Sequence, residues 1–129
     1  MKVLLDSDFV VALYKRKDSN HTKAVKLFRK IENESLVAIN LVFQESTTVI
    51  SKQMGMKDAK IFLGSIRRII GEEIKLNNIL EVKSWEVFLR QNKKGTSFVD
   101  CANLAILKEY NLDKIASFDK FYPNDMLLN

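Results

Sequence analysis

The sequence predicts an α/β protein, a three-layer α/β/α sandwich with a central, mainly parallel sheet of four to five short strands. Short apolar runs alternate with longer segments of helical periodicity along the whole chain. The runs are continuously apolar, which is typical of strands buried on both faces of a parallel sheet. The 129 residues contain only four glycines and one proline, so we expect one domain, residues 1–129, without a flexible linker.

The expected strands follow the apolar runs, and the expected helices fill the segments between them. The strands are 2–5, 35–39, 73–76, 114–117 and 126–128. The helices are 7–15, 21–31, 41–54, 57–70, 79–92 and 97–110, with a further helical turn at 119–122. The helix at 21–31 shows the clearest apolar face, made of Ala24, Leu27, Phe28 and Ile31.

Turn and capping residues set the boundaries of these helices. Residues 18–20 (Asp-Ser-Asn) precede the second helix, and residues 77–78 (Asn-Asn) precede the fifth. Glycines stand where three of the helices are expected to stop, at Gly55, Gly71 and Gly95.

The charge balance leaves two interpretations open. The net charge is +5 and the isoelectric point about 9.3. An excess of cations favours attraction to a polyanion such as nucleic acid. An excess of this size is equally typical of a lysine-rich, soluble surface.

The cysteine content and the hydropathy pattern favour a cytoplasmic protein. Cys101 is the single cysteine, so an internal disulfide is excluded, as expected for a reducing compartment. Asp6 and Asp8 interrupt the apolar start of the chain, and no small-residue cleavage site follows, which argues against a signal peptide. No apolar stretch reaches the length of a membrane span, so we expect no membrane association.

Four carboxylates lie beside apolar segments, where charged residues are rare unless something pairs with them. Asp6, Asp100 and Asp119 follow or border apolar runs, and Glu45 interrupts the apolar stripe of its helix. Asp6 and Asp119 come directly after expected strands. Because ligands of parallel sheets bind beyond the carboxyl ends of the strands, these two acids are expected at one edge.

Convergence of the four acids would require compensation. Two carboxylates about 5 Å apart repel by roughly 3 kcal/mol at an effective dielectric of about 20. A divalent metal or a shared proton must offset that repulsion. Taken singly, Asp6, Asp100 and Asp119 also suit helix starts, and Ser97 and Asp100 have the spacing of a capping box. The site is therefore a hypothesis about their joint arrangement.

Four segments in this order and at these distances resemble the PIN-domain nucleases, and the closest group is the VapC-type toxins of toxin–antitoxin pairs. The segments are LLDSDFVVALY, VFQESTTVI, SFVDCANLAIL and IASFDKFYP. The resemblance runs from Lys2 to the end of the chain and implies a single PIN-like nuclease domain. The family's acidic set carries over as Asp6, Glu45, Asp100 and Asp119.

Smaller parts of the family pattern are also present. Ser7 follows the first acid and Ser117 precedes the last by two positions, where the family usually has Ser or Thr. Asp8 stands where the family usually has a small polar residue. Asn103 lies one turn after Asp100 and is expected to face the site.

The resemblance implies Mg²⁺- or Mn²⁺-dependent hydrolysis of RNA that leaves a 5′-phosphate and a 3′-hydroxyl. In this interpretation Asp6 and Asp100 are the principal metal ligands, and Asp119 binds a second or weaker metal, or a water. Glu45 orients the attacking water or completes the ligand shell. The auxiliary residues, which hold the carboxylates or touch phosphate, are Ser7, Asp8, Asn103 and Ser117.

Two protein partners are expected by resemblance. The family usually forms homodimers, for which Met54, Met56, Phe62 and Ile66 are the candidate surface. A VapC-like toxin also has a cognate antitoxin that covers its active site. Basic segments at 15–17 and 67–68 are candidate phosphate contacts.

Other functions keep part of this site. A housekeeping RNA-processing nuclease or a structure-specific DNA nuclease would use the same acids, and a non-catalytic RNA-binding PIN module would not need them. A receiver-type phosphorylation switch is disfavoured, because the middle strand lacks a terminal Asp and no Lys-Pro follows the last strand. A zinc site is disfavoured because His21 is the only histidine and Cys101 the only cysteine.

Overall fold

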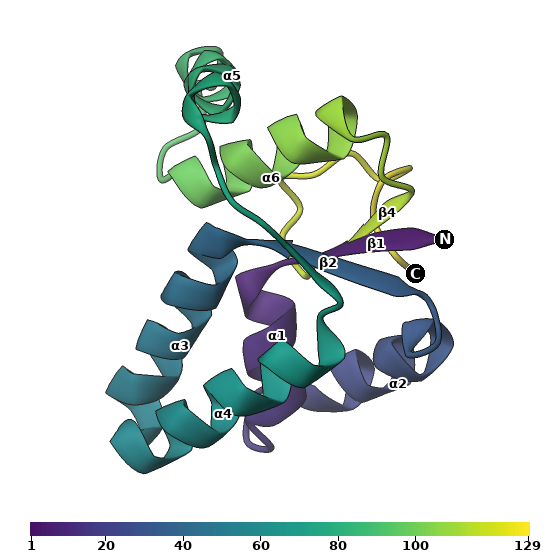
Figure 1. Cartoon of the computed structure of the whole chain (residues 1–129), viewed down its shortest axis with the longest axis vertical. Helices are drawn as coiled ribbons and strands as arrows, with labels where there is room; N and C mark the ends of the chain where they lie inside the picture. Colours follow the sequence, from purple (N-terminus) through teal and green to yellow (C-terminus); the bar gives the residue numbers. More distant parts are fainter.

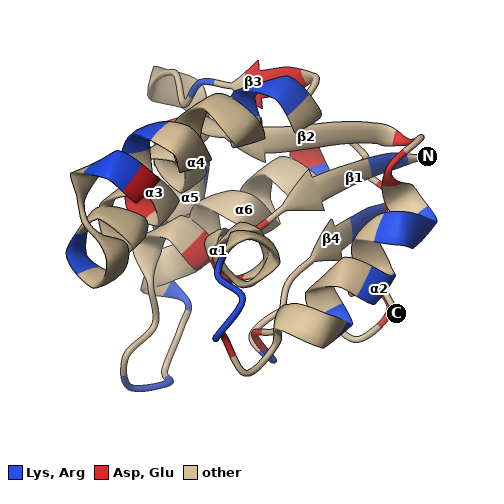
Figure 2. Cartoon of the chain, turned by 90° about the horizontal axis from the view of Figure 1, so that it is seen from below, with Lys and Arg blue, Asp and Glu red and all other residues tan.

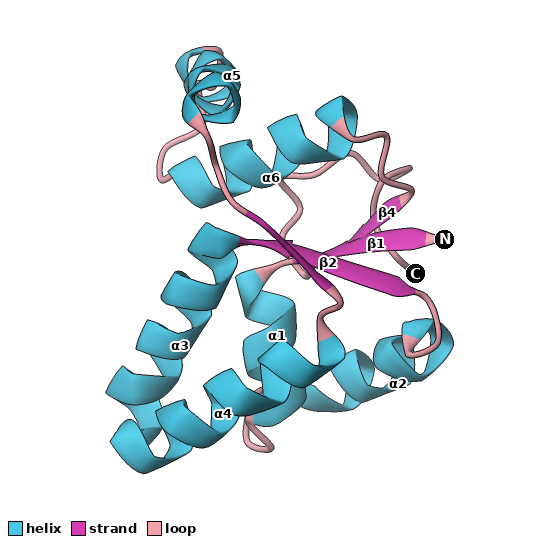
Figure 3. Cartoon of the chain, viewed as in Figure 1, coloured by secondary structure: helices cyan, strands magenta, loops and turns pink.

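The computed structural model describes residues 1–129 and shows a parallel sheet between two layers of helices (Figures 1 and 3). The strands are β1 (Lys2–Leu5), β2 (Ser35–Ile39), β3 (Glu72–Ile74) and β4 (Lys114–Ala116). The helices are α1 (Ser7–Tyr14), α2 (His21–Ile31), α3 (Asn40–Met54), α4 (Met56–Ile69), α5 (Asn78–Leu89) and α6 (Phe98–Glu109). Helices α5 and α6 lie on one side of the sheet and α1 to α4 on the other (Figure 1). The predicted three-layer architecture is confirmed.

The sheet has the order β3-β2-β1-β4, and all neighbours are parallel. The central strand β1 is completely buried at Val3, Leu4 and Leu5, as its uninterrupted apolar sequence predicts. The ladder between β1 and β4 continues one step past β1, where the Asp6 N–H donates to the Ala116 carbonyl at 3.0 Å. That bond holds the residues after β1 next to those after β4.

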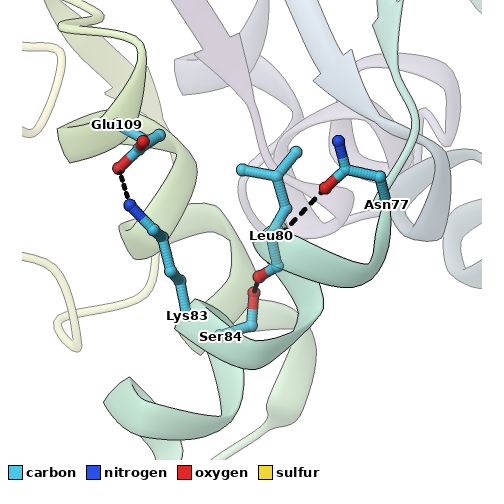
Figure 4. A network of polar contacts seen from close by, with 5 residues as sticks. All are labelled: Asn77, Leu80, Lys83, Ser84 and Glu109. Carbon is cyan, nitrogen blue, oxygen red and sulfur yellow. Dashed lines mark hydrogen bonds and ion pairs between the residues drawn. The ribbon is translucent and has the colours of Figure 1, made fainter.

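Helix boundaries follow the capping residues closely. Gly55 separates α3 from α4 with φ of +91°, a left-handed conformation that favours glycine. Asn77 caps α5 through a 2.9 Å hydrogen bond from the Leu80 N–H (Figure 4). Helix α5 ends at Leu89, three residues before its expected end at 92.

Helices α5 and α6 pack against each other and form the layer that carries Asp100 (Figure 1). An ion pair of 2.7 Å between Lys83 and Glu109 joins them, and the Ser84 hydroxyl donates to the Leu80 carbonyl within α5 (Figure 4). Trp85 packs against Phe98 with ring centroids 4.2 Å apart and an angle of 43° between the rings. The start of α6 is therefore fixed relative to α5.

Two expectations for the end of the chain are wrong. Residues 119–122 form no helical turn, because the Asp119 side chain accepts the Phe121 N–H at 2.9 Å and takes the place of a backbone carbonyl. Residues 126–128 form no strand, but Leu127 makes one parallel bridge to Ile115. Short polar turns around Pro123 interrupt both elements.

The surface differs from expectation at α4. Phe62 and Ile66, two of the four residues proposed for a dimer surface, are buried in the core. Met54 and Met56 are exposed, and Ile61 is a further exposed apolar residue of α4. None of the helices combines the length and apolar character needed to cross a bilayer.

Candidate functional site

The carboxyl edge of the sheet gathers most of the predicted site residues. Asp6 follows β1 and caps α1, accepting the Ser7 N–H at 2.8 Å. Asp100 lies in the first turn of α6, which begins after the Ser97 cap. Asp119 comes three residues after β4. The fold thus delivers acids from separate parts of the chain to one place.

Asp6 is the centre of this group. It is 3% exposed and accepts four hydrogen bonds from neutral donors. Oδ1 accepts from the Ser7 N–H and from Asn103 Nδ2 at 3.1 Å. Oδ2 accepts from Ser117 Oγ at 2.8 Å and from the Tyr122 hydroxyl at 3.2 Å. The Tyr122 hydroxyl also lies within hydrogen-bond distance of Asp100, so three donors hold Asp6 at all times and the fourth of its lone-pair positions opens whenever Tyr122 donates to Asp100.

Tyr122 connects Asp6 to Asp100 and was missed by the sequence analysis. Its hydroxyl lies 3.2 Å from Asp100 Oδ1 as well as from Asp6 Oδ2, and it accepts from Asn103 Nδ2 at 3.2 Å. The side chain is 1% exposed. A buried tyrosine hydroxyl usually finds a partner, but no periodicity or spacing indicates which one.

Ser117 joins the remaining acids. Its hydroxyl, besides donating to Asp6, lies 3.3 Å from Asp8 Oδ1 and accepts the Asp119 N–H at 3.0 Å. Asp8 Oδ2 also accepts the Phe118 N–H at 3.0 Å. Asp8 therefore ties α1 to the turn after β4 and keeps Asp119 in place.

Glu45 lies outside this hydrogen-bonded group. It is exposed, which contradicts its expected place inside the apolar stripe of α3. The buried positions of α3 are Val42, Phe43, Ser46 and Ile50. The buried stripe is therefore centred about one position further along the helix, and Glu45 lies at its border. Glu45 shares a surface hollow with Val99, the neighbour of Asp100, and its charge acts on Asp6. It stands at the rim of the acidic group.

No basic side chain or amino terminus pairs with the acids. The three ion pairs of the protein involve none of them. Burial raises the pKa of Asp6, against the hydrogen bonds from Ser117, Ser7 and Tyr122. Burial and then the charge of Asp6 raise the pKa of Asp8 to about 7. Burial, the charge of Asp6 and a hydrogen bond to Asp119 raise the pKa of Asp100 to about 8.

The chemistry of this group fits a hard divalent cation. Every donor is an oxygen, and uncompensated negative charge is what such an ion would neutralise. The carbonyl oxygen of Asn103 and the hydroxyl of Ser7 are buried without a hydrogen-bond partner, as acceptors of a water or hydrated ion would be.

The positions of the acidic side chains, unlike their chemistry, do not form a complete metal site. No group of three or more His, Cys, Asp or Glu side chains is arranged to hold a metal ion as it lies. Mg²⁺ is commonly held by one or two carboxylates with several waters, so a three-acid cluster is not required.

A separate hollow of about 920 Å³ lies at the other end of α1. Residues 15–17 line it, and its single acid, Asp58, accepts a hydrogen bond of 2.8 Å from Tyr14. With one acid that is already hydrogen-bonded, this hollow lacks the acids that a metal-dependent site needs. The acidic group therefore remains the candidate site, although it lines no comparable cavity.

The other polar candidates have structural roles. Cys101 is completely buried beside Asp100, and burial raises the pKa of its thiol, which argues against a nucleophile. The His21 ring lies 2.7 Å from the Ala12 carbonyl, between α1 and α2.

Comparisons with known proteins agree with this fold. No protein-family model matches the chain. The chain is 23% identical over 120 residues to the 23S rRNA-specific endonuclease VapC20 of two Mycobacterium tuberculosis strains, covering 91% of this chain and 88% of the relative. The crystal structure of VapC20, described as a toxin that cleaves the sarcin–ricin loop, superposes with a TM-score of 0.82. That superposition covers 92% of this chain and 91% of VapC20 at 21% identity.

Proposed function

We propose that this chain, a VapC-type PIN-domain protein by sequence and fold, is a metal-dependent endoribonuclease and the toxin of a toxin–antitoxin pair. The observation that carries the proposal is the group of buried and half-buried acids at the carboxyl edge of the sheet, where no cation compensates them. Several acids of raised pKa in one place are typical of a functional site.

Each acid takes a distinct role in this proposal. Asp6 and Asp100 would hold Mg²⁺ or Mn²⁺, and Asp119 would bind a second or weaker ion, or a water. When bound, such an ion lowers the pKa of water and offsets the charge that develops on the phosphodiester. Glu45, exposed at the rim, would orient the attacking water. Hydrolysis joins the water oxygen to phosphorus and breaks the bond to the 3′ oxygen, which leaves a 5′-phosphate.

The polar neighbours keep the acids in place. Ser117 would hold Asp6 and Asp119, and Asn103 would hold Asp6. The Ser7 hydroxyl is buried without a hydrogen-bond partner, so it would hold a carboxylate or a water beside Asp6. Asp8 would keep the Phe118–Asp119 turn against α1.

The distribution of cations suits an RNA backbone. Only Lys2 and Lys83 of the 21 Lys and Arg side chains form ion pairs. Lys93 and Lys94 lie in the loop that leads into α6 and Asp100. Figure 2 colours all Lys and Arg residues blue. Lys23 lies 5.7 Å from the Phe118 ring, beside the last acid. Cations around an acidic centre attract phosphates without neutralising the acids.

Cleavage of RNA tests the proposal. The purified protein is incubated with 23S rRNA, the substrate named for VapC20, and with unrelated RNA and DNA, in Mg²⁺, in Mn²⁺ and in a chelator. We expect RNA cleavage with either metal, products with a 5′-phosphate, and no cleavage with chelator. Cleavage that survives the chelator would overturn the proposed chemistry. Preference for structured DNA would favour the housekeeping alternative.

Two protein partners belong to the proposal. A cognate antitoxin would cover the acidic centre, and a second copy of the chain would bury Met54, Met56 and Ile61, which are 36%, 58% and 51% exposed. Light scattering on the wild type should give the mass of a dimer. Ile61→Lys should give a monomer, whereas Ile79→Lys, an exposed apolar position on α5, should leave the dimer intact. A monomeric wild type would contradict the dimer.

A further inference from the structure

Tyr122 lies between Asp6 and Asp100, the two proposed metal ligands. It comes from the turn before Pro123, yet its hydroxyl lies 3.2 Å from Asp6 Oδ2 and 3.2 Å from Asp100 Oδ1. No other side chain hydrogen-bonds to both acids. Asp6 belongs to the end of β1 and Asp100 to α6, so the hydroxyl joins segments that are 94 residues apart in sequence (100 − 6 = 94).

Packing of the ring and a hydrogen bond from Asn103 hold the Tyr122 hydroxyl in place. The ring is buried and packs edge-on against Phe121, with centroids 5.2 Å apart and an angle of 85°. Asn103 Nδ2 donates to the phenolic oxygen at 3.2 Å. Because Asn103 fills an acceptor position of that oxygen, the single phenolic proton points toward the two carboxylates.

The Tyr122 hydroxyl shares its one proton between the carboxylates of Asp6 and Asp100. The hydroxyl donates to Asp6 or to Asp100 at any moment, and its oxygen stays close to both. The position of that oxygen therefore limits how far apart the two carboxylates lie. Groups that hydrogen-bond to metal ligands orient those ligands, and their loss commonly costs 10- to 100-fold in metal affinity or activity.

We propose that Tyr122 is a positioning residue that holds Asp6 and Asp100 at the separation in which they bind a divalent cation, and that Asn103 aims its hydroxyl. This inference rests on the proposed function, because it assigns a role to Tyr122 toward the same ion. Tyr122 touches neither RNA nor the reacting atoms. It acts through the two acids.

Direct measurement of metal binding tests the role. Tyr122→Phe removes the hydroxyl and keeps the ring, and Mn²⁺ is titrated into the RNA-free protein by calorimetry. We expect Mn²⁺ to bind about tenfold more weakly than to wild type. The rise in melting temperature caused by Mn²⁺ should shrink, and kcat should fall while KM for RNA stays constant. Tyr110→Phe, an exposed tyrosine at the end of α6, is the matched control and should change nothing.

The outcomes separate this inference from the function on which it rests. If wild type binds no Mn²⁺, the proposed function fails. If wild type and Tyr122→Phe bind Mn²⁺ equally, only the role of Tyr122 fails. A variant that melts lower by the same amount with and without Mn²⁺ has lost packing alone, which would also overturn the role. Should Tyr122→Phe not fold, Asn103→Leu removes the amide donor at similar volume and should weaken Mn²⁺ binding too.

Discussion

Both ends of the β-sheet carry acids, but the acids at the two ends have opposite kinds of partners. At the amino end, Glu34 pairs with the Met1 amino group at 2.9 Å and Glu72 pairs with Lys2 at 3.8 Å, all at exposed positions. At the carboxyl end, Asp6 and Asp100 meet hydroxyl and amide groups and no cation. The exposed acids of the amino end thus have basic partners although water already screens their charge. The buried acids of the carboxyl end, where charge lowers stability, have none.

This contrast identifies which acids need an explanation beyond folding. Exposed ion pairs contribute little free energy, so the amino end would tolerate their loss. Buried acids without cations lower stability unless protons or a metal compensate them. An arrangement that costs stability in the isolated protein is typical of a functional site.

Cleavage should show the largest difference between the two ends. Asp100→Asn removes a proposed metal ligand and should lower kcat/KM for RNA by at least about 100-fold, since even partners of ligands commonly cost 10- to 100-fold. Glu72→Gln changes an acid of the amino end and should leave kcat/KM unchanged. Equal loss in both variants would remove the distinction between the ends.

Stability without metal should move in the opposite direction to activity. The amide of Asp100→Asn can donate to Asp119, as the protonated acid does, its oxygen can still accept from Tyr122, and it carries no charge. We therefore expect a higher melting temperature for the metal-free variant. Asp6→Asn should not share this gain, because its amide would face donors such as Ser117 and Asn103. A lower melting temperature for Asp100→Asn would contradict the charge argument.

Bound metal should make wild type more stable than Asp100→Asn, the reverse of the order expected without metal. At a concentration of Mn²⁺ 100 times its Kd, wild type should gain about 2.7 kcal/mol of unfolding free energy by linkage. Asp100→Asn should gain much less, and Glu72→Gln should gain as much as wild type. Thermal melts across a Mn²⁺ series measure all three proteins. The absence of any shift in wild type would contradict a metal site at the carboxyl end.

The pH dependence of stability should arise mainly at the carboxyl end. Folding raises the pKa of Asp8 to about 7 and of Asp100 to about 8, from about 3.9 in an unfolded chain. The folded protein thus binds more protons than the unfolded one between about pH 4 and 8, so metal-free stability should fall as pH rises through this window. Denaturant melts at several pH values should show the fall, and Asp100→Asn should flatten it. Stability that rises from pH 5 to 8 would contradict these shifts.

The amino end should give the smallest effect. Glu72→Gln breaks an exposed pair with Lys2 and should change the free energy of unfolding by less than about 1 kcal/mol. The change should disappear in 1 M salt, where exposed charges are screened. Urea melts at low and high salt measure it, and a loss comparable to that of a core substitution would show that the amino end is not merely a screened surface.

Sequence reasoning succeeded where local pattern decides the structure. Apolar runs fixed the four strands to within one or two residues at each end, and Gly55 marked a helix boundary. It was wrong where a side chain replaced a backbone bond, as at Asp119. Glu45 was misplaced because the buried stripe of α3 is centred one position further along the helix.

The polar partners of the site were harder to foresee than its acids. An acid after a strand has a position that topology alone determines, so Asp6 and Asp119 were expected together. Tyr122 contacts Asp6 across 116 positions of sequence, and its neighbours give no local signal of that contact. Contacts of this kind depend on how a turn packs, which neither periodicity nor capping rules describe.

The final residues protect one border of the sheet. Leu128 donates to the Ile115 carbonyl at 2.9 Å, and Ile115 donates to the Met126 carbonyl at 2.8 Å, so the tail covers the outer side of β4. Ser117 and Asp119 come directly after that strand. Proteolytic removal of residues 126–128 would leave the outer edge of β4 without hydrogen-bond partners. It would also make Ser117, which donates to Asp6, more mobile.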